Sequence, residues 1–217
     1  INKNAKIYTA ATDVTIDGLD ILFLPWICDD NLEDSLISID NTSAEIVMGH
    51  LEVKGFEMHK GVFNDHGLEK DQFTKFEKVL SGHFHKKSDD GRIYYLGTQY
   101  EITWSDYKCP KGFHIFDTGT RELERVSNPL RMFKKFYYDD VDKDYTNMNL
   151  SEYDNCFVKI FVQNKNDDDM YNNLLEKFYN TINVHELQIV DAPSDLTTSV
   201  REDILDNGGD TLTFLGN

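Results

Sequence analysis

The chain has 217 residues, a formal net charge of -17 and 40% hydrophobic residues. This length and composition allow one good hydrophobic core and a small second one, and no apolar run approaches the roughly 20 residues of a membrane-spanning helix. The negative charge argues against a broad basic surface that holds DNA through phosphate contacts. Any nucleic-acid contact therefore needs a local site, bound cations or a partner subunit.

The cysteines and the first residue give two further expectations. Cys28, Cys109 and Cys156 are odd in number and have no CxxC spacing, which indicates buried thiols in a reducing compartment. We therefore expect a cytoplasmic protein. Ile1 is not an initiating methionine, which points to a fragment of a longer chain.

The first elements in chain order are a hairpin and a helix. The stretch AKIYTAATDVTIDGLDILFLPW predicts two strands around Asp17-Gly18, a dipeptide typical of tight hairpin turns. Next, NLEDSLISI has apolar residues at helical spacing, and Asn31 is the predicted N-cap.

The middle of the chain predicts strands around one more helix. EIVMGH predicts a buried strand that delivers His50 at its C-terminal end, and KDQFTKFEKV predicts a helix with Phe73, Phe76 and Leu80 on one face. RIYYLGT and GFHIFDTGTRELERV predict strands again, the latter a hairpin with its turn at Asp117.

A polar, acidic stretch, YYDDVDKDYTNMNLSEYDN, then predicts a linker or a long surface loop. Beyond it, CFVKIFVQ, MYNNLLEKFYNTI and HELQIV predict a compact β-α-β module. The fold class is therefore α/β (α+β), with divisions at residues 1–127, 128–195 and 196–217, the last a tail or connector.

The stretch VLSGHFHKKS raises the question of a metal site. In an extended strand His83 and His85 would point to the same side, because side chains alternate with a period of two. A surface turn with incidental histidines explains the tripeptide equally well. His50 favours the metal interpretation, since IVMGH and VLSGH predict two parallel strands that end at one rim, where sites in open α/β sheets lie.

These motifs resemble a known family. GH at His50, GHFH and the following YYLGT look like the later motifs of calcineurin-like metallophosphoesterases, most of all the SbcD/Mre recombination nucleases and their T-even phage members. LFLPW and LGTQYEITWSD extend the resemblance over roughly residues 1 to 190. It implies that 1–127 is the C-terminal portion of a two-sheet nuclease domain and that 128–195 is a capping, DNA-binding domain.

The resemblance also implies cofactors and partners. His50 and His83 match ligands of one of two Mn²⁺ (or Mg²⁺) ions, and His85 matches a ligand of the other. Two such ions would clamp a phosphodiester and supply hydroxide near neutral pH. The implied function is a DNA exonuclease or endonuclease of recombination and repair, with DNA, an SMC/Rad-type ATPase and a second copy of the full-length subunit as partners.

The sequence departs from the family in its early motifs. The family's Asp-x-His, bridging aspartate and Gly-Asn-His-Asp are absent, and NDHG at 64–67 is interpreted as a loop. No catalytic residue beyond the metal ligands is therefore assigned, and we expect this chain alone to be inactive. The alternative is a non-catalytic module that binds DNA or the partner, with at most a structural metal.

A basic, aromatic stretch is the candidate DNA contact. RMFKKFYY contains Arg131, Lys134 and Lys135, and this mixture suits single-strand binding. An amphipathic strand entering the cap explains it equally well. Trp26 and Trp104 are assigned to core or rim packing rather than to base stacking.

Overall fold

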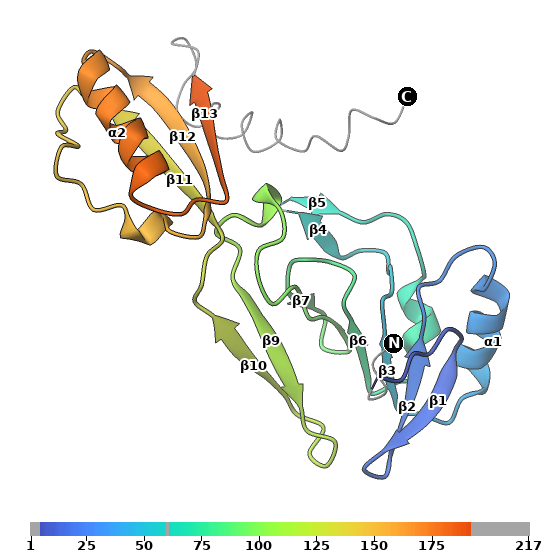
Figure 1. Cartoon of the computed structure of the whole chain (residues 1–217). Helices are drawn as coiled ribbons and strands as arrows, with labels where there is room; N and C mark the ends of the chain where they lie inside the picture. The colour runs from blue at the N-terminus through green and yellow to red at the C-terminus, as the bar shows by residue number, and fades with distance from the viewer. Residues whose placement is uncertain (1–4, 60, 192–217) are drawn as a thin grey trace. The chain divides into compact units, whose positions relative to one another are not determined.

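The computed structural model describes residues 5–59 and 61–191 of the chain, so the predicted tail at 196–217 lies outside the described residues. Contacts divide the chain into two units. The first comprises Ile1–Gln99 and Cys109–Pro129, and the second comprises Tyr100–Lys108 and Leu130–Asn217. Both mix strands with helix, which confirms the α/β (α+β) class (Figure 1).

A six-stranded sheet with the order β1-β2-β3-β6-β8-β7 forms the centre of the first unit. Its strands are β1 (Thr12–Ile16), β2 (Leu19–Leu24), β3 (Ile46–Gly49), β6 (Lys78–Ser81), β7 (Ser88–Asp89) and β8 (Ile93–Tyr95). β2, β3, β6 and β8 run parallel, whereas β1 and β7 pair antiparallel at the edges. The four parallel strands therefore all end at the same rim.

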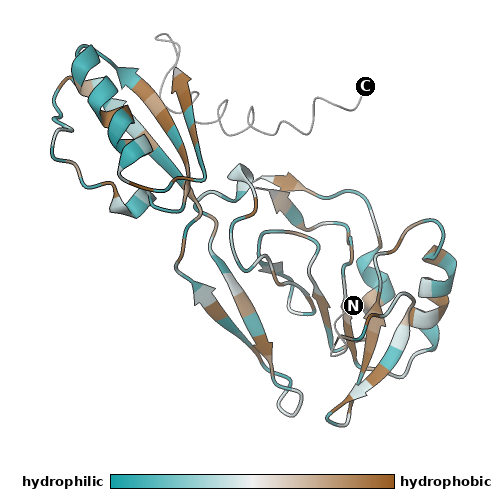
Figure 2. Ribbon diagram, in the orientation of Figure 1, coloured by the Kyte–Doolittle hydropathy of each residue, from teal (hydrophilic) through white to brown (hydrophobic). Residues whose placement is uncertain are grey.

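Two short two-stranded sheets and two helical segments complete this unit. They are β4 (Glu57–His59) with β5 (Val62–Phe63), β9 (Lys111–Phe116) with β10 (Leu123–Asn128), α1 (Leu32–Asn41) and a 3₁₀ turn, η1 (Lys70–Phe73). Val47 and Val79 of the sheet pack with Ile39 of α1 and Phe73 of η1 in one core, and the parallel strands are correspondingly apolar in Figure 2.

The β1–β2 hairpin forms as predicted. Its turn residues Asp17 and Gly18 have φ angles of 50° and 82°, the left-handed conformation that such turns require. Asn31 is the N-cap residue of α1, as predicted, but its side chain makes no capping hydrogen bond. The Asn31 side chain instead bonds backward, donating to the carbonyl oxygen of Trp26 and accepting from the N–H of Cys28.

The predicted helix over KDQFTKFEKV is also wrong, because only η1 forms there and β6 begins at Lys78. Phe73 and Phe76 are buried, but the alternation of β6 puts Val79 with them in the main core. Leu80 therefore points to the opposite face of the sheet. The spacing of apolar residues imitated a helix across a turn and a strand.

The second unit is a parallel sheet of β11 (Phe133–Asp139), β12 (Phe157–Asn164) and β13 (Glu186–Asp191), in that order. The helix α2 (Asp168–Asn180) connects β12 to β13, so the predicted β-α-β module is confirmed. Asp167 caps α2 by accepting from the N–H of Met170. Two 3₁₀ turns, η2 (Trp104–Asp106) and η3 (Ser151–Tyr153), belong to the same unit.

The acidic stretch predicted as a linker or surface loop begins inside β11 and continues as a loop to β12. Tyr145, Leu150 and Tyr153 from this loop are buried with Leu174 and Phe178 of α2 in the core of the second unit. The few apolar residues of the stretch thus anchor it to the core of the second unit, so the stretch is not a linker. Neither helix of the described residues has the length and apolarity to cross a membrane.

The expectation of buried thiols is correct for one cysteine only. Cys156 is buried in the core of the second unit, whereas Cys28 is exposed and Cys109 is half-buried. Burial raises the pKa of the Cys156 thiol, so this group stays protonated at neutral pH. All three cysteines are free thiols.

Candidate functional site

The C-terminal ends of three neighbouring parallel strands place an aromatic cluster at one rim. Leu24, Gly49 and Ser81 are the last residues of β2, β3 and β6, and they pair in register. The chain therefore delivers Trp26, His50 and His83 side by side. The predicted parallel arrangement of IVMGH and VLSGH is what brings the two histidines together.

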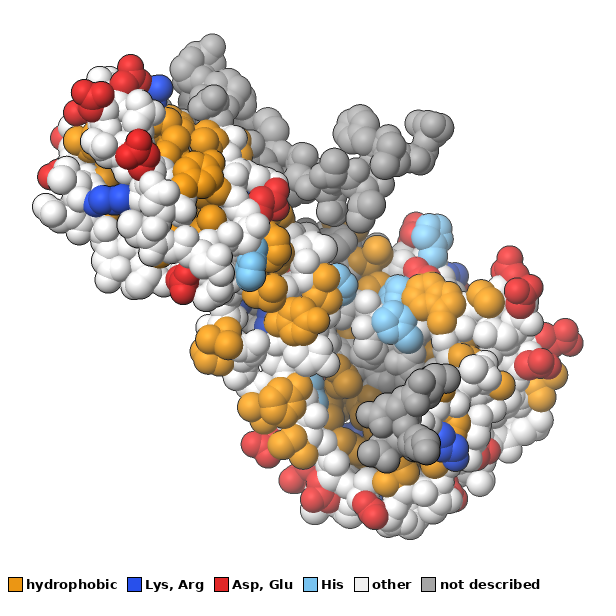
Figure 3. Space-filling view, viewed as in Figure 1, with side chains coloured by type: hydrophobic (Ala, Val, Ile, Leu, Met, Phe, Trp, Pro, Cys, Tyr) orange, Lys and Arg blue, Asp and Glu red, His pale blue; other side chains and the backbone are white. Residues whose placement is uncertain are grey.

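The two imidazoles lie close to each other and to the indole. The ring centroids of His50 and His83 are 5.0 Å apart and nearly perpendicular. Trp26 lies 5.3 Å from the His50 ring and 4.9 Å from the His83 ring, and its side chain is about half exposed. Figure 3 shows histidine and hydrophobic side chains next to each other on this face of the first unit.

Buried hydroxyl groups fix the loop that carries His50. The carbonyl oxygen of Leu51 accepts from the hydroxyls of Ser81 and Tyr95, while Ser81 also accepts from the N–H of Leu51. The Tyr95 hydroxyl accepts in turn from the N–H of Val53. Burial raises the pKa of Tyr95 far above its ordinary value, so the hydroxyl stays neutral and keeps donating.

His83 has an unusual environment for a polar side chain. Its Nδ1 atom is buried and has no hydrogen-bond partner. Burial, followed by repulsion from His50, lowers the pKa of His83, although the carboxylate of Glu52 acts in the opposite direction. The imidazole is thus neutral at pH 7, which is the form that binds a metal ion.

His50 and His85 are the other two predicted ligands. His50 is exposed, and partial desolvation together with the charge of His85 lowers its pKa. The segment carrying His83 and His85 is a series of bends, so of the two conformations that the sequence left open, an extended strand and a turn, the turn is the one observed. Phe84, which separates the two histidines in the sequence, is buried in the core, whereas both histidines are half-buried.

The donor set fits a metal ion in chemistry but is incomplete in number. Neutral imidazoles with a buried, unpartnered nitrogen suit a transition metal. Within 5–59 and 61–191, however, no group of three or more His, Cys, Asp or Glu side chains is arranged to hold a metal ion. A metal site built on these residues would therefore need further ligands.

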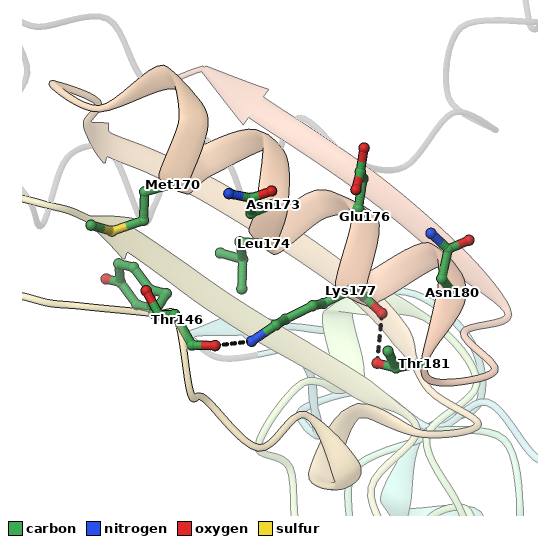
Figure 4. Close-up of a pocket in the computed structure, with 9 residues that line it drawn as sticks. Thr146, Met170, Asn173, Leu174, Glu176, Lys177, Asn180 and Thr181 are labelled. Carbon is green, nitrogen blue, oxygen red and sulfur yellow. Dashed lines mark hydrogen bonds between the residues drawn. The ribbon is translucent and has the colours of Figure 1, made fainter.

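A hollow of about 340 Å³ adjoins His50. The hollow is lined by His50, Trp26, Leu36, Glu52 and Gln72. It therefore has an aromatic side chain on one wall and a carboxylate on another. A second hollow of about 350 Å³ lies along α2 in the second unit, where Lys177 donates to the carbonyl oxygen of Thr146 (Figure 4). It contains none of the histidines.

Trp26 and Glu52 are the neighbours that sequence reasoning missed. Trp26 was assigned to packing because it follows an apolar strand, although it lies just after the end of β2, as His50 lies just after the end of the neighbouring β3. That shared position at strand ends was the available signal. Glu52 had no motif around it.

The predicted DNA-contacting residues do not form one surface. Arg131 forms an ion pair with the buried Glu101, at 3.3 Å, and Lys134 pairs with Glu152, at 3.4 Å. Lys135 lies over the rings of Tyr107 and Phe161. Because strand alternation turns Lys134 and Lys135 to opposite faces of the sheet, at most one of them belongs to any flat interface.

Comparison with known proteins places these features in context. The chain is 36% identical over 151 residues to exonuclease subunit 1 of Enterobacteria phage T4, a match covering 68% of the chain and 44% of that protein. It is 25% identical over 104 residues to the SbcD subunit of the SbcCD nuclease of Staphylococcus saprophyticus, a match covering 45% of the chain and 28% of that protein. The chain thus spans less than half the length of either relative, and no family model matches it.

Proposed function

Since the chain is related to the SbcD-type nuclease subunits, we propose that it is part of a metal-dependent DNA nuclease subunit that hydrolyses phosphodiester bonds in recombination and repair. The observation that carries the proposal is the pair of neutral imidazoles at the ends of β3 and β6, one with a buried Nδ1 that lacks a partner. The rim of a parallel sheet is also where ligands bind in such folds.

In this proposal His50, His83 and His85 hold Mn²⁺ or Mg²⁺, with carboxylates from another segment or another copy completing two sites. The bound ions would neutralise phosphate charge and generate hydroxide. The lowered pKa values of His50 and His83 keep both imidazoles unprotonated, so that their nitrogen lone pairs are available to a metal ion. Ser81 and Tyr95 hold the His50 loop in place.

The partners follow from the same relationship. We propose that DNA is the substrate, that an SMC-like ATPase subunit works with the nuclease subunit, and that the full-length subunit pairs with a second copy. The first unit would be the nuclease portion and the second unit the cap. Both relatives are named as subunits, which supports a multi-subunit assembly.

One observation favours the alternative, a non-catalytic module that binds DNA or a partner. Three imidazoles without a bridging carboxylate neutralise two divalent cations poorly, and no group of three ligands forms among the described residues. Under this alternative the histidines bind at most one structural ion.

The test is manganese-dependent cleavage of short single- and double-stranded DNA by the 217-residue chain, with chelator and His85→Ala controls. Cleavage that both controls abolish supports a complete site within the chain or between copies. Without cleavage by the chain alone, the same substitution is made in a longer protein that contains it. Full activity of that variant would contradict the metal assignment.

A further inference from the structure

The hollow beside His50 has a lining that suits a flat ligand with an apolar face. Its volume of about 340 Å³ falls in the range of small-molecule pockets. Leu32 and Leu36 of α1 form part of the lining, and Trp26, which is 51% exposed, contributes its indole ring. A ligand that enters the hollow therefore meets an aromatic ring and aliphatic side chains.

The turn after β2 holds Trp26 in place. The Asn31 side chain donates to the carbonyl oxygen of Trp26, at 2.9 Å, and accepts from the N–H of Cys28, at 2.8 Å. The indole also packs against the rings of His50 and His83. Because backbone and ring are both held before any ligand binds, stacking on the exposed part of the indole would carry little cost of ordering.

Glu52 brings a carboxylate to the lining of the same hollow. Its carbonyl oxygen accepts from the N–H of Leu68, at 2.9 Å. Gly67 has a φ of 86°, and a Cβ atom there would lie 2.3 Å from that oxygen. The loop NDHG at 64–67 therefore ends in close contact with the Glu52 backbone and fixes this wall of the hollow.

The Glu52 carboxylate is available to a ligand. The residue is half-buried, and no described residue forms a hydrogen bond or an ion pair with its side chain. The Glu69 carboxylate, by contrast, pairs with Lys54. Gln72 accepts through Oε1 from the N–H of Glu69, at 3.1 Å, which leaves its NH₂ group to donate. The hollow thus offers an unpaired carboxylate as acceptor and a carboxamide as donor.

Guanine is the nucleobase whose edge matches these groups. Its N1–H and its 2-amino N–H lie side by side, so they can donate together to the two oxygens of one carboxylate. The neighbouring O6 atom accepts from a donor such as a carboxamide. None of the other three bases of DNA has two N–H groups side by side on that edge. Enzymes that hold an unpaired base combine such edge contacts with stacking on aromatic side chains.

We propose that the hollow holds an unpaired guanine base of a DNA strand whose phosphate lies at the histidines. Trp26 stacks on the base, and Glu52 accepts from N1–H and from the 2-amino group. The carboxylate repels phosphate, so the phosphate stays outside the hollow, beside His50 and His83. The inference rests on the proposed function, which supplies the DNA, and deepens it by giving the site a preference for one base.

Equilibrium dialysis of tritium-labelled 2′-deoxyguanosine against the full chain in EDTA tests the proposal with a probe that has no phosphate. 2′-Deoxyinosine retains N1–H and O6 but lacks the 2-amino group, so it should bind about tenfold more weakly. Thymidine should bind more weakly than deoxyguanosine as well. Binding of deoxyinosine or thymidine as tight as that of deoxyguanosine would overturn the proposal.

Two pairs of variants assign the binding to the hollow. Glu52→Gln should weaken deoxyguanosine binding about tenfold and remove most of its advantage over deoxyinosine, whereas Glu122→Gln, at an exposed position of the first unit, should change neither. Trp26→Leu retains apolar bulk and should weaken the binding of all three nucleosides about tenfold through lost stacking. Tyr179→Leu is its control, since Tyr179 is 61% exposed on α2. Equal binding by hollow and control variants would contradict the assignment.

Competition identifies the natural source of the base. An oligothymidylate that ends in one deoxyguanosine should displace the labelled nucleoside at a lower concentration than plain oligothymidylate does. Equal displacement by the two strands would overturn the assignment to DNA. Displacement by N-acetylarginine amide at a lower concentration than by unlabelled deoxyguanosine would assign the hollow to a peptide side chain instead. Because these measurements use neither metal nor cleavage, failure of the histidine site leaves them unchanged.

Discussion

At the scale of single residues, the buried Nδ1 atom of His83 both destabilises the folded chain and offers a lone pair to a metal ion. A buried polar atom without a partner costs on the order of 1–3 kcal/mol, and Nδ1 of His83 is such an atom. Metal binding would remove that cost. Trp26 lies within 5.3 Å of both imidazole rings, so its fluorescence reports on any ion held there.

The first prediction uses this proximity. In a Trp104→Phe background, which leaves Trp26 as the single tryptophan, Mn²⁺ should quench the emission because the ion is paramagnetic. Adding His83→Ala should remove most of the quenching, whereas His66→Ala, whose side chain is 82% exposed, should leave it unchanged. Equal quenching in the two histidine variants would show that the ion binds elsewhere.

The second prediction concerns His114, whose two ring nitrogens are both buried without partners. Burial, followed by repulsion from Arg125 and Lys87, lowers the pKa of His114 in the folded chain. The unfolded chain, with an imidazole pKa of about 6.5, therefore binds more protons, and stability falls as pH drops through that value.

His114→Leu should flatten this dependence, because it removes the titrating group and the unpartnered nitrogens together. Urea unfolding at pH 7.5 and 5.5 measures this pH dependence of the free energy of unfolding. We expect the variant to lose less stability than the parent over this interval, and His66→Leu to lose as much as the parent. An unchanged slope for His114→Leu would contradict the argument.

At the scale of elements, two glycines at the rim play different parts. A Cβ on Gly49, the last residue of β3, would lie 2.8 Å from the carbonyl oxygen of Leu24 in β2. One on Gly82 would lie 3.7 Å from Nδ1 of His50, an ordinary contact distance. Close approach of backbone is therefore required between β2 and β3 at Gly49, and not at Gly82.

The third prediction compares these glycines. Gly49→Ala should destabilise the chain by about 1–3 kcal/mol, since β2 and β3 must separate. It should also weaken the Mn²⁺ quenching, because His50 moves with the end of β3. Gly82→Ala should have little effect on either quantity. Chemical denaturation and the quenching titration check both, and equal destabilisation of the two variants would be the contrary result.

Local signals account for the elements that could be predicted. Asp17-Gly18 specified its hairpin through φ, and alternation with helical spacing specified the β12-α2-β13 module. The helix over 70–79 failed because Phe73 and Phe76 reach the core from a turn, which imitates helical periodicity. The proximity of His50 and His83 was predictable because each follows the end of a predicted parallel strand, whereas the contacts of Trp26 with both imidazole rings depend on the pairing of β2 with β3.

At the scale of the whole molecule, each unit has its own core, but the chain does not divide at one point. Tyr100–Lys108 belongs to the second unit although Cys109–Pro129 returns to the first. Glu101 explains the attachment. Its buried carboxylate accepts from the N–H groups of Met132 and Phe133 and pairs with Arg131.

The fourth prediction follows from this attachment. A polypeptide with Tyr100–Lys108 joined to Leu130–Asn217 by a short Gly/Ser linker should unfold cooperatively, because it contains the whole second unit. A short linker suffices because Lys111 and Asn128 pair in the intact chain, which brings the ends at Lys108 and Leu130 close together. Leu130–Asn217 alone should be less stable, since the N–H groups of Met132 and Phe133 lose the Glu101 carboxylate as their acceptor, and the loss at the buried Phe133 N–H alone costs about 1–3 kcal/mol. Equal melting of the two polypeptides would contradict it.

The interleaving of the units also has a consequence for biosynthesis. A ribosome completes Trp104 and Glu101 well before it makes β12, so these residues emerge without the sheet that they cover. At 5–20 residues per second that delay is on the order of seconds. During this time the nascent chain exposes the indole of Trp104 and the carboxylate of Glu101, whose partners in the second unit are not yet made. The order of synthesis thus makes the second unit the last part of the described chain to fold.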